Sequence, residues 1–301
     1  MTQLEEARRP SDPVFFSKLN NLELRARTVV EGFLQGLQRS PFHGYSAEFA
    51  SHREYSPGDD LRHVNWKLFA RQKRLYVKEY DAETNMNLYL MLDVSGSMAC
   101  SSGGVSKLGY GSTLAAALTY LALRQRDAVG VTLLADSVRA HVPPSSKPQQ
   151  LEEILMTIAQ SQDRPRSDAR RAFHPAAELA RHRGLVVIIS DLLDDVDALL
   201  AGIEHLRFRR HEVVVFHVLD PLELDLAMAG NVRFRDLETE EEVIVRVEGI
   251  REEYRRAVDQ WRSKLEAECR ERLVDRIELR TDQPLDQALV DYLVRRSQLA
   301  S

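Results

Sequence analysis

The pattern of apolar and polar residues along the chain changes near residue 88. Beyond it, short apolar runs alternate with stretches in which apolar residues recur at helical spacing. The runs "LVVII" (185–189) and "VVVFHVL" (213–219) are continuously apolar, which indicates strands buried on both faces of a sheet. Such alternation predicts an α/β fold with a doubly wound, mostly parallel sheet. The predicted strands are 88–92, 128–135, 184–190, 212–219 and 275–281, and the predicted helices are 114–126, 148–160, 173–183, 195–209, 249–273 and 285–297.

The residues before residue 88 show a different pattern and composition. Apolar residues at helical spacing predict one leading helix over 14–38. The following segment is rich in turn formers and aromatic residues, and it contains the turn "SPGDD" and the alternating stretch "RLYVKEY". We therefore expect a helical lead at 1–40, a small, partly β module at 41–84, and a main domain at 85–301 with a β-hairpin insertion near 231–247.

Composition narrows the class of protein. The chain has 301 residues, of which 44% are hydrophobic and 29% charged, as in ordinary globular proteins. A net charge of −5 does not favour a nucleic acid partner, since phosphate binding calls for a basic excess. Cys100 and Cys269 match no CxxC pattern, so neither a disulfide framework nor structural zinc is expected. "MTQLEEARRP" lacks the apolar stretch of a signal peptide, and no apolar run approaches the roughly 18–20 residues of a membrane span. We expect a cytoplasmic protein.

The stretch "LYLMLDVSGSM" (88–98) joins a buried strand to polar side chains. The apolar strand ends at Asp93, and Ser95 and Ser97 follow on a glycine-containing loop. A second acidic residue, Asp191, follows the apolar run "LVVIIS". In open parallel sheets, ligands bind beyond the carboxyl ends of strands, at the point where the strand order reverses. If the two strands are neighbours, these side chains converge on one crevice.

Two carboxylates in one crevice repel each other unless a cation neutralises them. Oxygen ligands favour magnesium, manganese or calcium over zinc. The sequence therefore predicts a divalent cation held by both carboxylates and the two serine hydroxyls. The alternative is that Asp93 and the serines only cap the next segment through Asx and serine turns.

The same motifs carry a family resemblance. "DVSGSM" after an apolar strand, with the second strand end "ISD", resembles the metal-ion-dependent adhesion site (MIDAS) of von Willebrand factor A-like domains. Upstream, "EFASHREYSPGDDLRHVNWKLFARQKRLYVKEYDAE" resembles the family called domain of unknown function 58. "FRDLETEEEV", "IELRTDQPL" and "LVDYLVRR" are similar to the C-terminal half of that family, so the resemblance extends from residue 30 to residue 297.

Two positions depart from the family pattern. The family places a threonine before the helix that precedes "GLVVIISD", and this chain offers Ser167 there, with Asp168 beside it. A serine hydroxyl can ligate a cation in the same way. The metal ligands that the resemblance implies are Asp93, Ser95, Ser97, Ser167 and Asp191. The second departure is Asn65, which precedes Trp66 where the family usually has an aspartate.

The resemblance implies a metal-ion-dependent protein–protein interaction module. A divalent cation, magnesium or else manganese or calcium, would keep one coordination position for an acidic side chain of a partner. The implied partner is a MoxR-type AAA+ ATPase, for which such proteins are expected to act as adaptors or co-chaperones. Two alternatives stay open, a scaffold whose degenerate site holds no metal and a magnesium-dependent hydrolase.

An enzyme is not expected from the residues themselves. The chain has no GxxxxGK[ST] phosphate loop and no GxSxG elbow. "DVSGS" lacks the second carboxylate of an aspartyl-phosphate-forming loop, because Ser95 stands at that place. Hydrolysis at a single magnesium ion would need a positioned base, and nothing in the sequence singles out Asp194 or Asp195 for that role.

Two further features have competing interpretations. Residues 52–78 carry more basic than acidic side chains. They form either an exposed strip for an acidic partner or internal pairs between arginines and the carboxylates Asp59 and Asp60. His217 lies inside a predicted buried strand, and we expect a hydrogen-bonded core histidine there rather than a ligand.

Overall fold

The computed structural model describes residues 22–39, 52–54, 76–78, 86–161, 173–193, 196–235 and 242–290. The chain divides into two compact units, Ser40–Asn85 and the remainder. In the smaller unit, β1 (His52–Glu54) pairs antiparallel with β2 (Tyr76–Lys78), which falls within the predicted strand "RLYVKEY". Several predicted features lie outside the described residues, namely Asn65, Trp66, Ser167, Asp168, Asp194, Asp195 and the side chains of the basic run 52–78.

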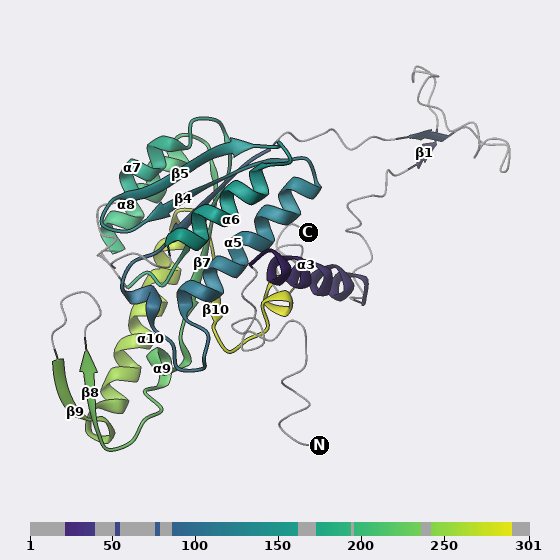
Figure 1. Ribbon diagram of the computed structural model, residues 1–301. Helices are drawn as coiled ribbons and strands as arrows, with labels where there is room; N and C mark the ends of the chain where they lie inside the picture. Colours follow the sequence, from purple (N-terminus) through teal and green to yellow (C-terminus); the bar gives the residue numbers. More distant parts are fainter. Residues whose placement is uncertain are drawn as a thin grey trace, which may run out of the picture. The chain divides into compact units, whose positions relative to one another are not determined.

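In the larger unit, the described strands include six that form one sheet (Figure 1). They are β3 (Asn87–Asp93), β4 (Ala128–Leu134), β5 (Val138–Ser145), β6 (Gly184–Ser190), β7 (Glu212–Leu219) and β10 (Asp275–Arg280). Their order is β10–β7–β6–β3–β4–β5. All neighbours are parallel except β4 and β5, which are antiparallel. This arrangement confirms the predicted doubly wound, mostly parallel α/β fold.

Helices cover both faces of this sheet (Figure 1). On one face lie α3 (Leu22–Arg39), α5 (Lys107–Arg124), α6 (Gln150–Ser161) and the helical residues 285–290, and on the other lie α7 (Phe173–Leu179), α8 (Val196–Phe208) and α10 (Val247–Glu271). Successive side chains of a strand point to opposite faces, so Leu90 of β3 packs in the first core and Met91 in the second. A continuously apolar strand thus serves two cores.

The start of α5 differs from the prediction. The helix begins at Lys107 rather than at 114, because Ser106 caps it by accepting a hydrogen bond from the Gly109 amide at 3.0 Å. The segment contains Gly109 and Gly111, and glycine is a poor helix former. One of these glycines lets the helix approach the sheet, since a Cβ on Gly111 would lie 3.1 Å from Cγ2 of Ile189. The first turn of α5 is thereby placed at the carboxyl edge of the sheet.

Smaller elements lie between the strands and helices at this edge. A short 3-10 helix, η2 (Ser97–Ala99), follows β3, and α9 (Pro221–Asp225) follows β7 without having been predicted. The predicted hairpin is present as β8 (Asn231–Arg235) paired antiparallel with β9 (Glu242–Arg246) (Figure 1). None of the helices that the structure describes combines the length and the apolar character needed to cross a bilayer.

Candidate functional site

The candidate site lies at the carboxyl ends of two neighbouring strands. β3 ends at Asp93, β6 ends one residue before Asp191, and the strands run parallel with Leu92 opposite Ile189. From β3 the chain continues into β4 on one side and later returns to β6 on the other. The strand order therefore reverses between β3 and β6, which is where such sheets bind ligands. The structure brings the two predicted carboxylates together at this point.

The loop after β3 holds the first predicted carboxylate and both serines. Asp93 is buried, and its Oδ1 accepts a hydrogen bond from the Ser95 amide at 2.9 Å. Its Oδ2 accepts from the Ser190 hydroxyl at 2.6 Å. The hydroxyls of Ser95 and Ser97 lie 3.1 Å apart. The Asx turn of the alternative interpretation is therefore present, and the same turn gathers three oxygen-bearing side chains.

The charge of Asp93 is poorly compensated. Burial and the negative charge of Asp191 raise the pKa of Asp93 to about 7, and the hydrogen bonds from Ser190 and Ser95 offset this only in part. Among the described residues, no lysine, arginine or histidine forms an ion pair with Asp93. A cation at this loop would stabilise the ionised carboxyl group.

Asp191 already has a cationic partner within the chain. The side chains of Lys107 and Asp191 are fully buried, and Nζ of Lys107 lies 2.6 Å from Oδ2 of Asp191. Lys107 also forms an ion pair with Glu223 of α9. Burial alone would lower the pKa of Lys107, but the charges of Asp191 and Glu223 raise it above its ordinary value. Part of the neutralisation expected from a metal is thus supplied by an ammonium group.

Neither Lys107 nor Glu223 was found from the sequence. The helix predicted from the sequence starts at 114 and does not include Lys107. The signal that marks it is Ser106, an N-cap residue immediately before "KL". Glu223 occupies the third position of α9, where its carboxylate accepts from the Asp220 amide at 3.0 Å. "DPLE" therefore carried a capping-box signature with proline at the first helical position.

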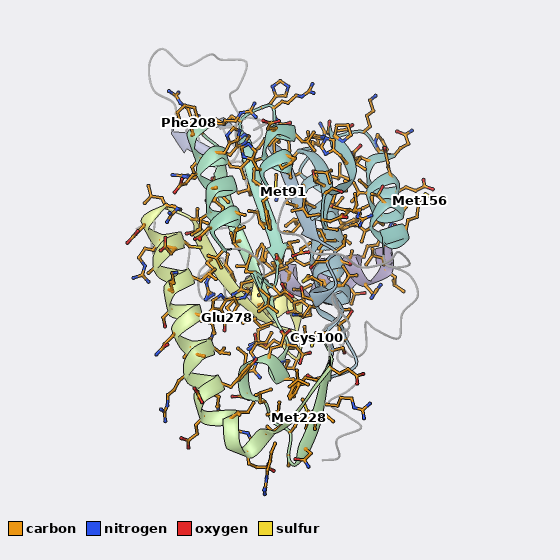
Figure 2. The ribbon with its side chains drawn as sticks, turned by 90° about the vertical axis from the view of Figure 1, so that its left-hand side faces the viewer. Met91, Cys100, Met156, Phe208, Met228 and Glu278 are labelled. Carbon is orange, nitrogen blue, oxygen red and sulfur yellow. The ribbon has the colours of Figure 1, made fainter. Side chains whose placement is uncertain are left out.

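Buried polar contacts fix this edge of the molecule. The carboxylate of Asp220 accepts from the Ser102 amide at 2.9 Å, which ties the loop after η2 to α9. The Tyr254 hydroxyl of α10 donates to the Glu223 carbonyl at 2.8 Å. Beside Glu223 lies a mostly apolar cavity of about 300 Å³, and Figure 2 shows Cys100, one of its lining residues. The cavity is lined by Cys100, Leu222, Glu223, Leu226, Phe234, Ile250 and Tyr254.

His217 is a hydrogen-bonded core histidine, as predicted. Its Nδ1 lies 3.1 Å from a guanidinium nitrogen of Arg276, which can only donate. The other ring nitrogen, Nε2, therefore carries the proton and donates to the Asp191 carbonyl at 2.9 Å. Burial and the charge of Arg276 lower the pKa of His217 to about 3, so the ring is neutral. His217 thus holds the backbone just before Leu192, a residue with a positive φ of 54°.

The donor set fits a hard divalent cation. In the part of the chain that the structure describes, no three His, Cys, Asp or Glu side chains form a metal-binding group. The candidate set instead combines two carboxylates with the hydroxyls of Ser95 and Ser97, all oxygen donors of the kind magnesium, manganese and calcium prefer. Oδ1 of Asp191 accepts only a long bond, 3.3 Å, from the Leu193 amide. Ser167, the fifth implied ligand, lies outside the described residues.

Comparison with known proteins gives a family and no function. The family model described as "Protein of unknown function DUF58" matches residues 51–264. The chain is 30% identical over 233 residues to the uncharacterized proteins Rv1480 of Mycobacterium tuberculosis and Mb1516 of Mycobacterium bovis, which covers 76% of this chain and 72% of each relative. It is also similar to the crystal structure of the conserved hypothetical protein BatB from Bacteroides thetaiotaomicron, with a TM-score of 0.44 and 15% identity over 71% of this chain and 99% of that chain.

Proposed function

The chain belongs to the DUF58 family of proteins of unknown function, and on that premise we propose that it is a metal-ion-dependent protein-interaction module of the von Willebrand factor A-like kind. Its binding face is the carboxyl edge of the sheet. The observation that carries the proposal is the buried carboxyl group of Asp93, which has no cationic partner among the described residues and lies beside two hydroxyls and a second carboxylate.

Each residue has a defined part in this proposal. Asp93, Ser95 and Ser97 offer the oxygens of one loop, and Asp191 offers the oxygen that Lys107 leaves without an ion pair. Ser167 completes the set by family resemblance. Bound there, magnesium, manganese or calcium would supply one coordination position for a carboxylate of a partner. Lys107 and His217 fix the side chain and the carbonyl of Asp191, respectively.

The partner that we propose is a MoxR-type AAA+ ATPase in the cytoplasm, with this chain as its adaptor or co-chaperone. The support for this partner is family resemblance alone. The cavity beside Glu223 adds a place for an apolar side chain, and Glu223 is linked to Asp191 through Lys107. In such an interface the metal–carboxylate contact fixes orientation, and buried apolar anchors supply most of the affinity.

A second candidate is an interaction scaffold that holds no metal. The observation that favours it is the ion pair between Lys107 and Asp191, in which both side chains are fully buried. In this version the ammonium group of Lys107 replaces the divalent ion and serves only the fold. We propose no enzymatic activity for either version.

A thermal unfolding titration separates the two candidates. With magnesium at 100 times its dissociation constant, a bound ion stabilises the folded state by about 2.7 kcal/mol and raises the unfolding midpoint. Asp93→Ala should abolish this rise. Asp127→Ala is the control, because Asp127 is also a buried aspartate but precedes β4 at the opposite edge. The absence of any rise with millimolar magnesium, manganese or calcium would contradict the metal version.

Lys107→Met tests the internal ion pair. It leaves Asp191 and Glu223 buried without their cation, which should cost about 3–5 kcal/mol of unfolding free energy, whereas Lys147→Met at an exposed lysine should cost little. In the metal version, magnesium restores part of the lost stability, and in the scaffold version it restores none. Binding of a purified MoxR-type ATPase with and without chelator then tests the partner.

A further inference from the structure

The amino-terminal edge of the sheet, opposite the candidate site, carries a cluster of arginines. They lie in or next to the turns that lead into β6 and β7, two neighbouring strands. The turns are in contact, since Nε2 of His211 lies 3.1 Å from the carbonyl of Ala180. The five arginines are Arg181, Arg183, Arg207, Arg209 and Arg210.

These arginines differ from most of those in α10 and β10. Seven arginines between residues 247 and 280 form ion pairs, namely Arg255, Arg256, Arg262, Arg270, Arg272, Arg276 and Arg280, whereas Arg251 donates to backbone carbonyls. None of the five in the cluster forms an ion pair in the described part of the chain, and Arg207 and Arg209 donate only to backbone carbonyls. They outnumber the acidic residues of the same turns, Glu178 and Glu212. Unpaired positive charge is thus concentrated here on a chain whose net charge is −5.

The same edge presents two protruding apolar side chains. Phe208, at the end of α8, is 87% exposed, and Leu273, in the turn before β10, is 75% exposed. These are the two highest values among the large hydrophobic side chains of the described residues. β7 and β10 are neighbours, and an ion pair of 2.9 Å between Arg272 and Glu204 ties the second turn to α8. Figure 2 shows Phe208 at the end of the molecule away from Cys100.

The fold does not account for the leucine side chain. Leu273 follows the end of α10 with a φ of 54°, in the left-handed region where helices most often end on glycine. A β-carbon is unfavourable in that conformation, and the exposed side chain gains little packing in return. Glycine would serve the turn better, and the exposed leucine side chain is available for a contact outside the folded chain.

We propose that this arginine edge, made of the five arginines with Phe208 and Leu273, docks the protein peripherally on an anionic phospholipid membrane. Guanidinium groups bind phosphates through paired hydrogen bonds, and protruding apolar side chains insert among lipid headgroups. A folded protein or nucleic acid would need a pocket matched to each of the two protruding side chains. A headgroup layer adapts to both, which favours the membrane. The inference is independent of the proposed metal site, which lies at the other edge.

Vesicle co-sedimentation of the full chain tests the proposal. Binding is expected to vesicles of phosphatidylglycerol and phosphatidylethanolamine but not to pure phosphatidylcholine, and to weaken at about 0.5 M salt because surface charges are screened. Phe208→Ser with Leu273→Gly, and separately Arg183→Glu with Arg210→Glu, should each weaken binding about tenfold or more. The controls are Met156→Ser, at an exposed position on α6 that Figure 2 labels, and Arg256→Glu, at an exposed position on α10. Both should bind as the parent chain does.

Measuring the stability of the variants shows whether a loss of vesicle binding results from unfolding. Leu273→Gly should leave the unfolding midpoint unchanged or higher, since glycine adopts the left-handed conformation freely, so lost binding cannot be ascribed to unfolding. Equal binding to both kinds of vesicle, no binding to either, or unchanged binding by the two double variants would overturn the proposal. So would binding of polyglutamate or RNA without binding of anionic vesicles, which would indicate an acidic protein or a nucleic acid instead.

Discussion

Asp93 and Asp191 adjoin neighbouring strand ends, yet their charges are compensated in different ways. Asp191 is paired with the ammonium group of Lys107, whereas Asp93 accepts hydrogen bonds from Ser95 and Ser190 and has no cation beside it among the described residues. Hydrogen bonds from neutral donors offset burial only in part. A proton and a metal ion therefore compete for the same oxygens of Asp93, and pH is a direct probe of that competition.

Without divalent cations, the free energy of unfolding should fall as the pH rises from about 4 to about 7. The pKa of Asp93 has its ordinary value of 3.8 in the unfolded chain and rises to about 7 in the folded chain. Well below 3.8, the pKa in the unfolded chain, both states are protonated, and the contribution of this group is fully present. Between the two pKa values the unfolded state ionises first, so that contribution is lost, on the order of 4 kcal/mol at about 1.4 kcal/mol per pKa unit.

Asp93→Asn measures this contribution by urea denaturation at pH 5 and pH 8. The variant cannot ionise, and its amide can still accept from Ser95 and donate to Ser190. Its stability relative to the parent chain should therefore be greater at pH 8 than at pH 5. A difference that does not change with pH would show that Asp93 stays ionised throughout, and Asp127→Asn is the control for a general effect of removing a buried carboxylate.

The sequence was sufficient to locate the site but not its internal cation. Asp93 and Asp191 each follow a continuously apolar strand, and that position marks a strand end in any parallel sheet. Lys107 lies in "SSGGVSKLGYGS", whose glycines and serines match a loop by composition. Its role depends on where the first turn of α5 lies relative to β6 and α9. That relation arises from packing, which local sequence patterns do not report.

Among the elements, the bounds of the buried strands could be predicted from the sequence, whereas the start of α5 could not. β6 and β7 begin and end at the predicted residues, because polar residues or glycine bound each buried apolar run. The first two turns of α5 were missed because glycine is a poor helix former. Gly111 is tolerated there since its missing side chain makes room for Leu92 and Ile189, which directly precede the two strand ends of the site. A local cost in helix propensity thus accompanies a close contact between helix and sheet.

Gly111→Val should destabilise the protein by about 1–3 kcal/mol, because new methyl groups must displace core side chains that lie 3.1–3.5 Å from the first added carbon. Gly249→Val is the matched control. It makes the same substitution in α10, where a Cβ meets nothing within 4 Å, and should change stability by less than about 0.5 kcal/mol. Urea denaturation of both variants gives the comparison, and equal effects would show that α5 does not need the close approach.

The two candidate surfaces lie at opposite edges of the sheet, one strand length apart. The metal site lies at the carboxyl ends of β3 and β6, and the arginine edge lies at the amino ends of β6 and β7. A strand of seven residues, such as β6, spans about 23 Å at roughly 3.3 Å per residue. The strands between the two edges are buried and pair in parallel register, so we expect them to behave as one rigid layer.

The two surfaces should therefore act independently. Asp93→Ala should leave binding to anionic vesicles unchanged, and Phe208→Ser with Leu273→Gly should leave the magnesium-induced rise in unfolding midpoint unchanged. In the combined variant, the losses in unfolding free energy should add within about 0.5 kcal/mol, since the substituted residues share no partners. Linkage makes the test reciprocal, because vesicles that altered magnesium affinity would themselves bind more or less tightly with magnesium present. A coupling above about 1 kcal/mol in either direction would contradict a rigid sheet and would require a second conformation of the strands that join the two edges.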